Sequence, residues 1–214
     1  MYKYMTMDSE YCSMGRWISV IVGHQMHMKL YEGQDLIALC DEDWLTEDYL
    51  VEFDERISIM SLEDVKKDSQ MQKVHTALTK AIFKAIEQGP CIIHERAAGD
   101  ILKERQDCLK VLLYNTSTEH KIPRAIADKT YDLEDLPHDD IVSFMKSRDH
   151  MRAVYRNAVA STMWGDKRSY DLCLDSDILS REKCAEILIE ALKDVSLDLD
   201  ECADIVHKSF TWTK

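Results

Sequence analysis

Short apolar runs alternate with stretches of helical periodicity along almost the whole chain, and this alternation restricts the possible folds more than any single motif. The runs expected to form strands are Tyr2–Met7, Lys29–Glu32, Pro90–Glu95, Cys108–Asn115 and Ser169–Ser176. The helical patterns cover approximately Gly15–Met28, Ser69–Gln88, Thr118–Asp128, Pro137–Ala158 and Arg181–Asp194. Strands that alternate with helices form parallel βαβ units with helices on both faces of the sheet. We therefore predict an α/β fold of about five parallel strands, with a ligand site at their carboxyl ends.

The length and composition indicate one globular domain over residues 1–214. The chain has 45% hydrophobic and 31% charged residues, with only six glycines and three prolines from which linkers could be built. No apolar run approaches the roughly 20 residues of a membrane-spanning helix, and the amino terminus has no signal-peptide pattern. We expect a cytoplasmic protein that does not bind membranes.

The seven cysteines are odd in number, scattered and never spaced as C-x-x-C. This arrangement suggests neither a disulfide framework nor a zinc ribbon. Cys91 and His94 are three residues apart, but on a strand their side chains would point to opposite faces of the sheet. We expect reduced thiols and no protein-bound metal site.

The net charge of −13 argues against broad nucleic-acid binding, because the phosphate backbone requires a basic surface. The charge is unevenly distributed, however. Between Lys146 and Arg168, six basic residues stand against two acidic ones, which gives this segment +4 and the rest of the chain −17. An isolated basic segment in an acidic protein suggests a small anionic ligand rather than a polymer.

Most of these basic residues lie on the helix expected over Pro137–Ala158. Arg148 and Arg152 fall inside its apolar stripe, and Arg156 lies at the edge of that stripe. Because the arginines point toward the apolar side, we predict a cleft lined by guanidinium groups. The alternative is a solvated charged face.

The stretch "EYCSMGRWIS" (Glu10–Ser19) joins the first expected strand to the first expected helix. A tight loop that enters a helix leaves backbone amides unpaired, and phosphate oxygens can accept from them. Compared with the phosphate-loop pattern G-x-x-x-x-G-K-[ST], the chain keeps Gly15 and has Arg16 at the lysine position. Trp17 replaces the hydroxyl that would hold magnesium. Taken alone, this stretch is better explained as an ordinary strand-to-helix turn.

Four segments together carry a more specific signal. "MDSEYCSMGR" is similar to I-S-R-E-[YF]-G-S-G-G-R, "LYEGQDLI" to a helix end with F-Y-D-K-E-L-I, and "HERAAGDIL" to a strand followed by G-R-x-A. The most extensive match, "RDHMRAVYRNAVASTMWGDKRSYDLCLDSDIL", is similar to D-x-x-R-x-x-Y, then W-G, then Y-D-L-x-L-[DN]-[ST]. With these segments the chain resembles the cytidylate kinase-like family of P-loop nucleoside-monophosphate kinases over roughly residues 4–192.

The resemblance implies a three-layer P-loop NTPase fold with a helical lid at about residues 137–168. It implies an ATP-dependent nucleoside-monophosphate kinase that uses Mg²⁺ with ATP and has CMP or dCMP as acceptor. The residues that it assigns to the donor phosphates are Ser13, Met14, Gly15 and Arg16. Those that it assigns to the acceptor are Arg96, Tyr31 and Asp35. Catalysis would involve Arg16 together with three lid arginines, Arg148, Arg152 and Arg156.

Departures from the family pattern support a second hypothesis. Cys12 and Met14 replace loop glycines, and Glu95 stands where glycine is expected. The chain could therefore be a catalytically weakened relative that binds a nucleotide or a protein partner. A third possibility is an α/β domain whose loop binds nothing, with the arginines satisfied by carboxylates such as Asp149 or Asp171.

The sequence leaves the acceptor base and the oligomeric state open. The acidic segment "DVSLDLDECADIVHKSF" near the end of the chain has the pattern of a capped terminal helix.

Overall fold

A computed structural model describes residues 2–193 of the chain and contains a five-stranded parallel sheet. The strands lie in the order β2-β3-β1-β4-β5, and each neighbouring pair is parallel. Their bounds are β1 Tyr4–Ser9, β2 Lys29–Tyr31, β3 Cys91–His94, β4 Cys108–Tyr114 and β5 Leu172–Asp175. The predicted α/β P-loop fold is confirmed. The acidic segment at residues 194–210, predicted as a terminal helix, lies outside the described residues.

The described helices are α1 Gly15–Met26, α2 Gly33–Ala38, α3 Glu47–Ser58, α4 Leu62–Lys67, α5 Ser69–Glu87, α6 Ala98–Ile101, α7 Thr118–Ala127, α8 His138–Val159 and α9 Arg181–Lys193, with a 3₁₀ turn at Lys167–Ser169. The five predicted helices are present. The short helices α2, α3, α4 and α6 were not predicted. Within the described residues, no helix combines the length and apolar character needed to cross a membrane.

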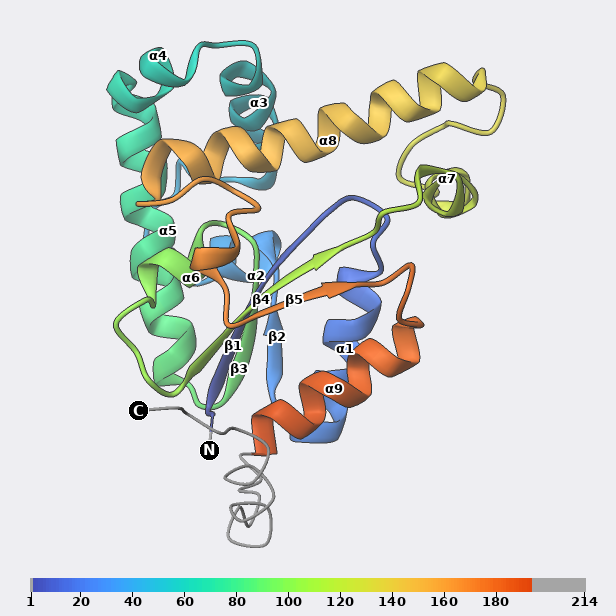
Figure 1. The fold of residues 1–214 in the computed structure, drawn as a ribbon. Helices are drawn as coiled ribbons and strands as arrows, with labels where there is room; N and C mark the ends of the chain where they lie inside the picture. Colours follow the sequence, from blue (N-terminus) through green and yellow to red (C-terminus); the bar gives the residue numbers. More distant parts are fainter. Residues whose placement is uncertain (1, 194–214) are drawn as a thin grey trace, which may run out of the picture.

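Helices cover both faces of the sheet and give three layers (Figure 1). α1 and α9 pack together on one face, where Ile18, Val22 and Leu188 are fully buried against the strands. α5 covers the other face with Leu78 and Ile82 in a second apolar cluster. The burial of these periodic apolar residues explains why sequence periodicity located the main helices.

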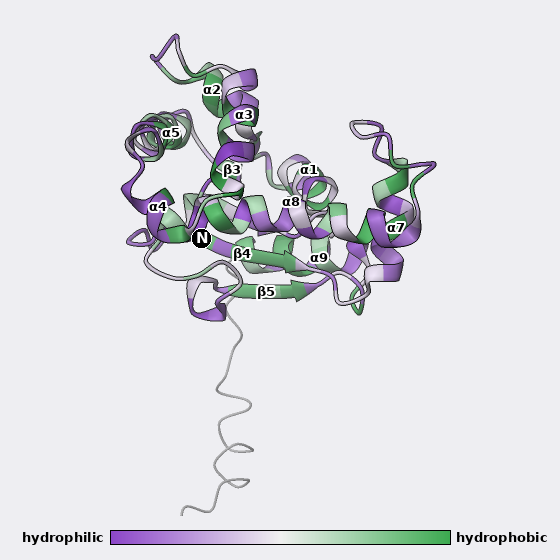
Figure 2. Ribbon diagram, turned by 90° about the horizontal axis from the view of Figure 1, so that it is seen from above, coloured by the Kyte–Doolittle hydropathy of each residue, from purple (hydrophilic) through white to green (hydrophobic). Residues whose placement is uncertain are grey.

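The long helix α8 crosses the molecule beyond the carboxyl ends of the strands (Figure 1). It packs against α3 and α4 at one end and against α7 at the other. Seen from above, β4 and β5 are mostly hydrophobic, whereas α8 alternates between hydrophilic and hydrophobic residues (Figure 2). Two polar side chains of α8, Arg152 and Arg156, reach Ser9 and Asp8 at the carboxyl end of β1, where ligands bind in α/β folds.

The first strand begins and ends two residues later than the predicted Tyr2–Met7. β1 continues through Asp8 and Ser9, which pair with β4 at Leu112 and Leu113. Both side chains are buried, and hydrogen bonds satisfy them, because Asp8 accepts from Arg156 and the hydroxyl of Ser9 lies 3.2 Å from Nε2 of His94. The loss of apolar character at Asp8 thus marks the start of the polar site and not the end of the strand.

Candidate functional site

The loop between β1 and α1 has a left-handed backbone at two residues that carry side chains. Cys12 has φ +62° and Met14 has φ +72°, and this region costs a non-glycine residue about 1–2 kcal/mol. The loop delivers the amides of Gly15 and Arg16 into the first turn of α1, where no carbonyl of the helix can accept from them. The backbone geometry is thus suited to an anion at the start of α1.

Position 15 requires glycine because neighbouring side chains leave no space for a Cβ atom. A Cβ atom here would lie 2.6 Å from both Cβ and Oγ of Ser9 and 3.1 Å from Nε2 of His94. α1 consequently begins in direct contact with the ends of β1 and β3. This contact fixes the amides of the first turn relative to the sheet.

A cavity of about 890 Å³ lies beside the loop, within the size range of ligand pockets. Arg16, Arg96 and Arg152 all line it, although they come from α1, the β3–α6 connection and α8. The side chain of Arg16 is 76% exposed, and its Nε lies 3.0 Å from Oε2 of Glu32. Side chains of α1 and α7 form two further walls of this cavity: Trp17, Val20, Ile21, Arg124, Ala127 and Asp128.

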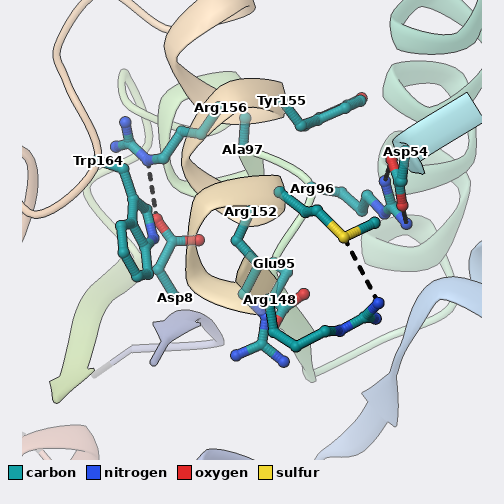
Figure 3. A pocket seen from close by; sticks show the side chains of 11 residues that line it. Asp8, Asp54, Glu95, Arg96, Ala97, Arg148, Arg152, Tyr155, Arg156 and Trp164 are labelled. Carbon is teal, nitrogen blue, oxygen red and sulfur yellow. Dashed lines mark hydrogen bonds and ion pairs between the residues drawn. The ribbon is translucent and has the colours of Figure 1, made fainter. Parts of the chain in front are cut away.

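The arginines of α8 line a second, smaller cavity of about 110 Å³ (Figure 3). Arg156 is fully enclosed, and its Nε donates to Oδ2 of Asp8 at 2.8 Å. Arg152 donates through Nη1 to the carbonyl oxygen of Ser9 at 2.8 Å, and its Nε lies 3.0 Å from Oε1 of Glu95. These contacts connect the middle of α8 to the end of β1.

Arg148 differs from the other two arginines because it forms no ion pair with a carboxylate of the described residues, whereas Arg152 and Arg156 each form one. Its Nη1 lies 3.5 Å from the sulfur of Met151, and its guanidinium carbon lies 5.0 Å from the ring centroid of Tyr131. In total, four arginines and three carboxylates line the smaller cavity. The lining of this cavity therefore has a net charge of +1, and Arg148 can still bind an added anion. The expected arginine-lined cleft is therefore present, and carboxylates already compensate most of its positive charge.

Arg96 is held by a carboxylate that the sequence analysis did not single out. Its Nη1 and Nη2 donate to the two oxygens of Asp54 on α3 at 2.9 and 2.7 Å, and both side chains are largely buried. The backbone turns sharply here, since Glu95, Arg96 and Ala97 have φ of +67°, +56° and +57°. Arg96 still lines both cavities described above. A ligand in either cavity would therefore meet a guanidinium that already pairs with Asp54.

Two buried titratable groups lie at the end of β3. Burial lowers the pKa of His94 and favours the neutral imidazole. Burial alone would raise the pKa of Glu95, but the charges of Arg152, Arg96 and Arg148 outweigh this effect and lower the pKa. Glu95 therefore remains a carboxylate at neutral pH, and a phosphate at this position would need to displace or share Arg152.

The structure does not bring Tyr31 into the site. Its side chain is 1% exposed, and its hydroxyl donates to Oε1 of Gln88 at the carboxyl end of α5. The apolar ring completes the core beneath α5 and lines none of the cavities near the loop, so no contact in the structure supports the assignment of Tyr31 to the acceptor. Asp35 lines a third cavity of about 330 Å³ next to Arg16 and Arg96. Its Oδ2 accepts from the amide of Glu32, which caps α2.

Charged residues from α7 and α8 contact the loop itself, and the sequence analysis did not identify this role. Asp149 accepts through Oδ1 from the amide of Tyr11 at 2.5 Å. Nζ of Lys121 lies 3.1 Å from Oε2 of Glu10 and 3.5 Å from Oδ2 of Asp149. Burial raises the pKa of Asp149, and the hydrogen bond from Tyr11 and the charge of Lys121 offset part of this effect. The D-x-x-R spacing placed Asp149 one turn from Arg152, but no sequence pattern indicated contact with the loop.

The residues fit the phosphates of a nucleotide better than its magnesium ion. The amides of Gly15 and Arg16 suit phosphate oxygens, whereas Trp17 supplies no oxygen ligand. The hydroxyl of Ser13 donates to the carbonyl oxygens of Glu10 and Leu113. Over residues 2–193, no cluster of three or more His, Cys, Asp or Glu residues could hold a metal ion. Magnesium that enters with ATP would be held chiefly by phosphate oxygens and water.

Comparisons with known proteins give the family of this chain and a solved structure with a similar fold. The model of the cytidylate kinase-like family matches residues 4–178. A crystal structure of an uncharacterized protein from Eubacterium ventriosum is 18% identical, with a TM-score of 0.69 over 90% of this chain and 99% of that one. Shikimate kinase from Acinetobacter baumannii is 10% identical, with a TM-score of 0.49 over 92% of this chain and 97% of that one. No curated protein matches the sequence.

Proposed function

Because the chain belongs to the cytidylate kinase-like family, we propose that it is an ATP-dependent nucleoside-monophosphate kinase with CMP or dCMP as acceptor. The observation that carries the proposal is the convergence of Arg16 and Arg152 on one cavity of about 890 Å³ beside the loop at Ser13–Arg16. Helix amides and guanidinium groups from distant parts of the chain face the same space. Such a site is suited to two phosphorylated ligands bound end to end.

In this reaction an acceptor phosphate oxygen forms a bond to the γ-phosphorus of ATP as the bond to the ADP oxygen breaks. No covalent protein intermediate is needed, and catalysis rests on alignment and on charge neutralisation. The loop amides would hold the donor phosphates, and Arg96 would bind the acceptor phosphate. Arg148 would approach the transferring phosphoryl group, since it forms no ion pair with a carboxylate of the described residues. Arg152 would join it by exchanging Glu95 for phosphate oxygens.

A coupled assay with ATP, Mg²⁺ and a panel of nucleoside monophosphates tests this proposal. We expect turnover with CMP or dCMP and a loss of at least 100-fold in kcat for Arg148→Ala, which removes one charge-stabilising group. Lys146→Ala is the matched control, because it removes an exposed positive charge from the same helix. Absence of turnover with every acceptor would contradict the proposal.

The second candidate function is nucleotide binding without phosphoryl transfer. One specific observation favours it: the carboxylate of Glu95 lies in the arginine-lined cavity and pairs with Arg152. A negative group here opposes the approach of phosphate oxygens and occupies a guanidinium that catalysis would require.

Thermal unfolding in the presence of ATP and of CMP, measured alongside turnover, separates the two candidates. A ligand at 100 times its dissociation constant adds about 2.7 kcal/mol to the free energy of unfolding. Stabilisation by either nucleotide without turnover would favour the binding function. In that case Glu95→Gly should raise turnover, because glycine both removes the carboxylate and suits the positive φ at this position.

A further inference from the structure

The phosphate loop of this chain keeps a left-handed backbone without glycine at the two residues that adopt it. Cys12 and Met14 have positive φ and carry full side chains, so the same backbone is less favourable here than in a glycine-rich loop. Contacts from elsewhere in the molecule must therefore stabilise the loop if it is to hold its shape without a ligand.

Two side chains from other elements bracket the first of these residues. Asp149 on α8 accepts from the amide of Tyr11 at 2.5 Å. Arg124 on α7 donates through Nη1 to the carbonyl oxygen of Cys12 at 3.0 Å. One contact fixes the peptide unit before Tyr11, and the other fixes the peptide unit after Cys12. Together they restrict the backbone angles of both residues.

A largely buried charge cluster holds the Asp149 side chain in place. Lys121 is 7% exposed, and its Nζ lies between the carboxylates of Glu10 and Asp149 at 3.1 and 3.5 Å. Glu10 also accepts from the amide of Asn115 at the end of β4. The loop, α7, α8 and β4 are thus connected through one lysine and two carboxylates.

We propose that Asp149 and Arg124 are positioning residues that replace the conformational role of the glycine missing at Cys12 and hold the loop ready for phosphate. This inference rests on the proposed function for its ligand, but the restraint on the loop exists in the free protein. Asp149 acts through the backbone amide of Tyr11 and need not touch the nucleotide. The alternative is that the Asp149 carboxylate repels phosphate and so inhibits nucleotide binding.

The first test measures hydrogen exchange of the Tyr11 amide in the full-length protein without ligand. We expect slow exchange in the wild type, exchange at least tenfold faster in Asp149→Ala, and wild-type exchange in Asp149→Asn, which retains an acceptor oxygen. Asp140→Ala, an exposed acid on the same helix, is the control. Unchanged exchange in Asp149→Ala would overturn the inference, whether or not the protein binds nucleotides.

The second test measures the dissociation constant of ADP in a double-mutant cycle that combines Asp149→Ala with Cys12→Gly. Asp149→Ala should weaken ADP binding about tenfold in the wild-type loop, the loss expected for one hydrogen bond to a charged group. The loss should shrink to threefold or less in the glycine-substituted loop, and Asp149→Asn should bind ADP as the wild type does. Equal losses in both loops, or tighter binding by Asp149→Ala, would overturn the inference. If no form binds ADP, the proposed function fails, and the exchange test alone decides the positioning role.

Discussion

Close contacts constrain individual residues near the loop, and sequence patterns identify only some of these residues. Gly15 and Arg16 were identifiable from the family pattern, because their spacing follows directly from the loop. Asp8 and Asp54 were not identified, since a single aspartate at a strand end or on an unpredicted helix carries no distinctive pattern. Their importance follows from pairing across the fold, with Arg156 and Arg96 respectively.

Replacing Gly15 by alanine should destabilise the protein by about 1–3 kcal/mol, the usual cost of overpacking. The added methyl group would lie 2.6 Å from the Cβ and Oγ of Ser9, at the buried junction of α1 and β1. Urea denaturation provides the measurement. Gly33→Ala is the control, because a methyl group added there would have no neighbouring atom within 4 Å and alanine favours the helix. A Gly15→Ala variant as stable as Gly33→Ala would contradict the packing described at this junction.

His94 should make the folded state sensitive to mild acid. Burial lowers its pKa below the ordinary value, so the unfolded chain binds a proton that the folded protein does not. The free energy of unfolding should therefore fall as the pH decreases below about 6.5, by at most about 1.4 kcal/mol per pH unit from this group. The fall should stop below the folded-state pKa.

Urea denaturation between pH 5 and pH 8 would detect this contribution as the difference between the wild type and His94→Gln. The variant should have the shallower pH dependence, because it cannot take up the proton. The exposed His24→Gln controls for the loss of a histidine elsewhere on the surface. Parallel curves for the wild type and His94→Gln would rule out the proposed neutral buried state.

At the level of secondary structure, the sequence predicted the helices and strands that bury a continuous apolar face. The strands and the helices α1, α5, α7, α8 and α9 were located because their periodicity is long and regular. α3 was missed although Thr46 caps it and Leu50, Phe53 and Ile57 form a buried stripe. Its acidic composition obscured a signal that capping and spacing together could have revealed.

A buried ion pair and apolar packing together hold α8 in position. Arg156 is 3% exposed, and it donates to Asp8 through Nε and to the carbonyl oxygen of Thr162 through Nη1. Tyr170 donates to the same carboxylate at 2.7 Å. These contacts join β1, α8 and the segment that leads into β5. Residues 137–168, the segment expected to form a lid, are thus connected to β1, the central strand of the sheet.

Arg156→Met should lower the free energy of unfolding by about 3–5 kcal/mol, because it leaves the buried carboxylate of Asp8 without its cation. The double variant Asp8→Asn/Arg156→Met should be more stable than Arg156→Met alone, since it removes the uncompensated charge. Chemical denaturation of the three proteins gives both differences, with the exposed Arg168→Met as control. A double variant less stable than Arg156→Met would show that the charge of Asp8 is not the source of the loss.

At the scale of the whole molecule, an acidic protein concentrates positive charge at one edge of its sheet. The segment from Lys146 to Arg168 carries +4 in a chain of net charge −13. The fold places Arg148, Arg152 and Arg156 of this segment around one cavity, and Arg152 also lines the cavity beside the loop that precedes α1. The sequence revealed the charge imbalance and the loop. It did not reveal how fully carboxylates from β1, α3 and the β3–α6 connection compensate the arginines, because that depends on contacts between distant segments.

The central claim is that the amides at the start of α1 and the guanidinium of Arg152 on α8 face one anion-binding cavity. A crystal structure of the protein with ADP and CMP tests it most directly. The account predicts ADP phosphate oxygens within hydrogen-bond distance of the amides of Gly15 and Arg16, with the guanidinium of Arg152 reaching the same phosphates. Nucleotide phosphates bound away from this loop, with Arg152 contacting only Glu95 and Ser9, would contradict it.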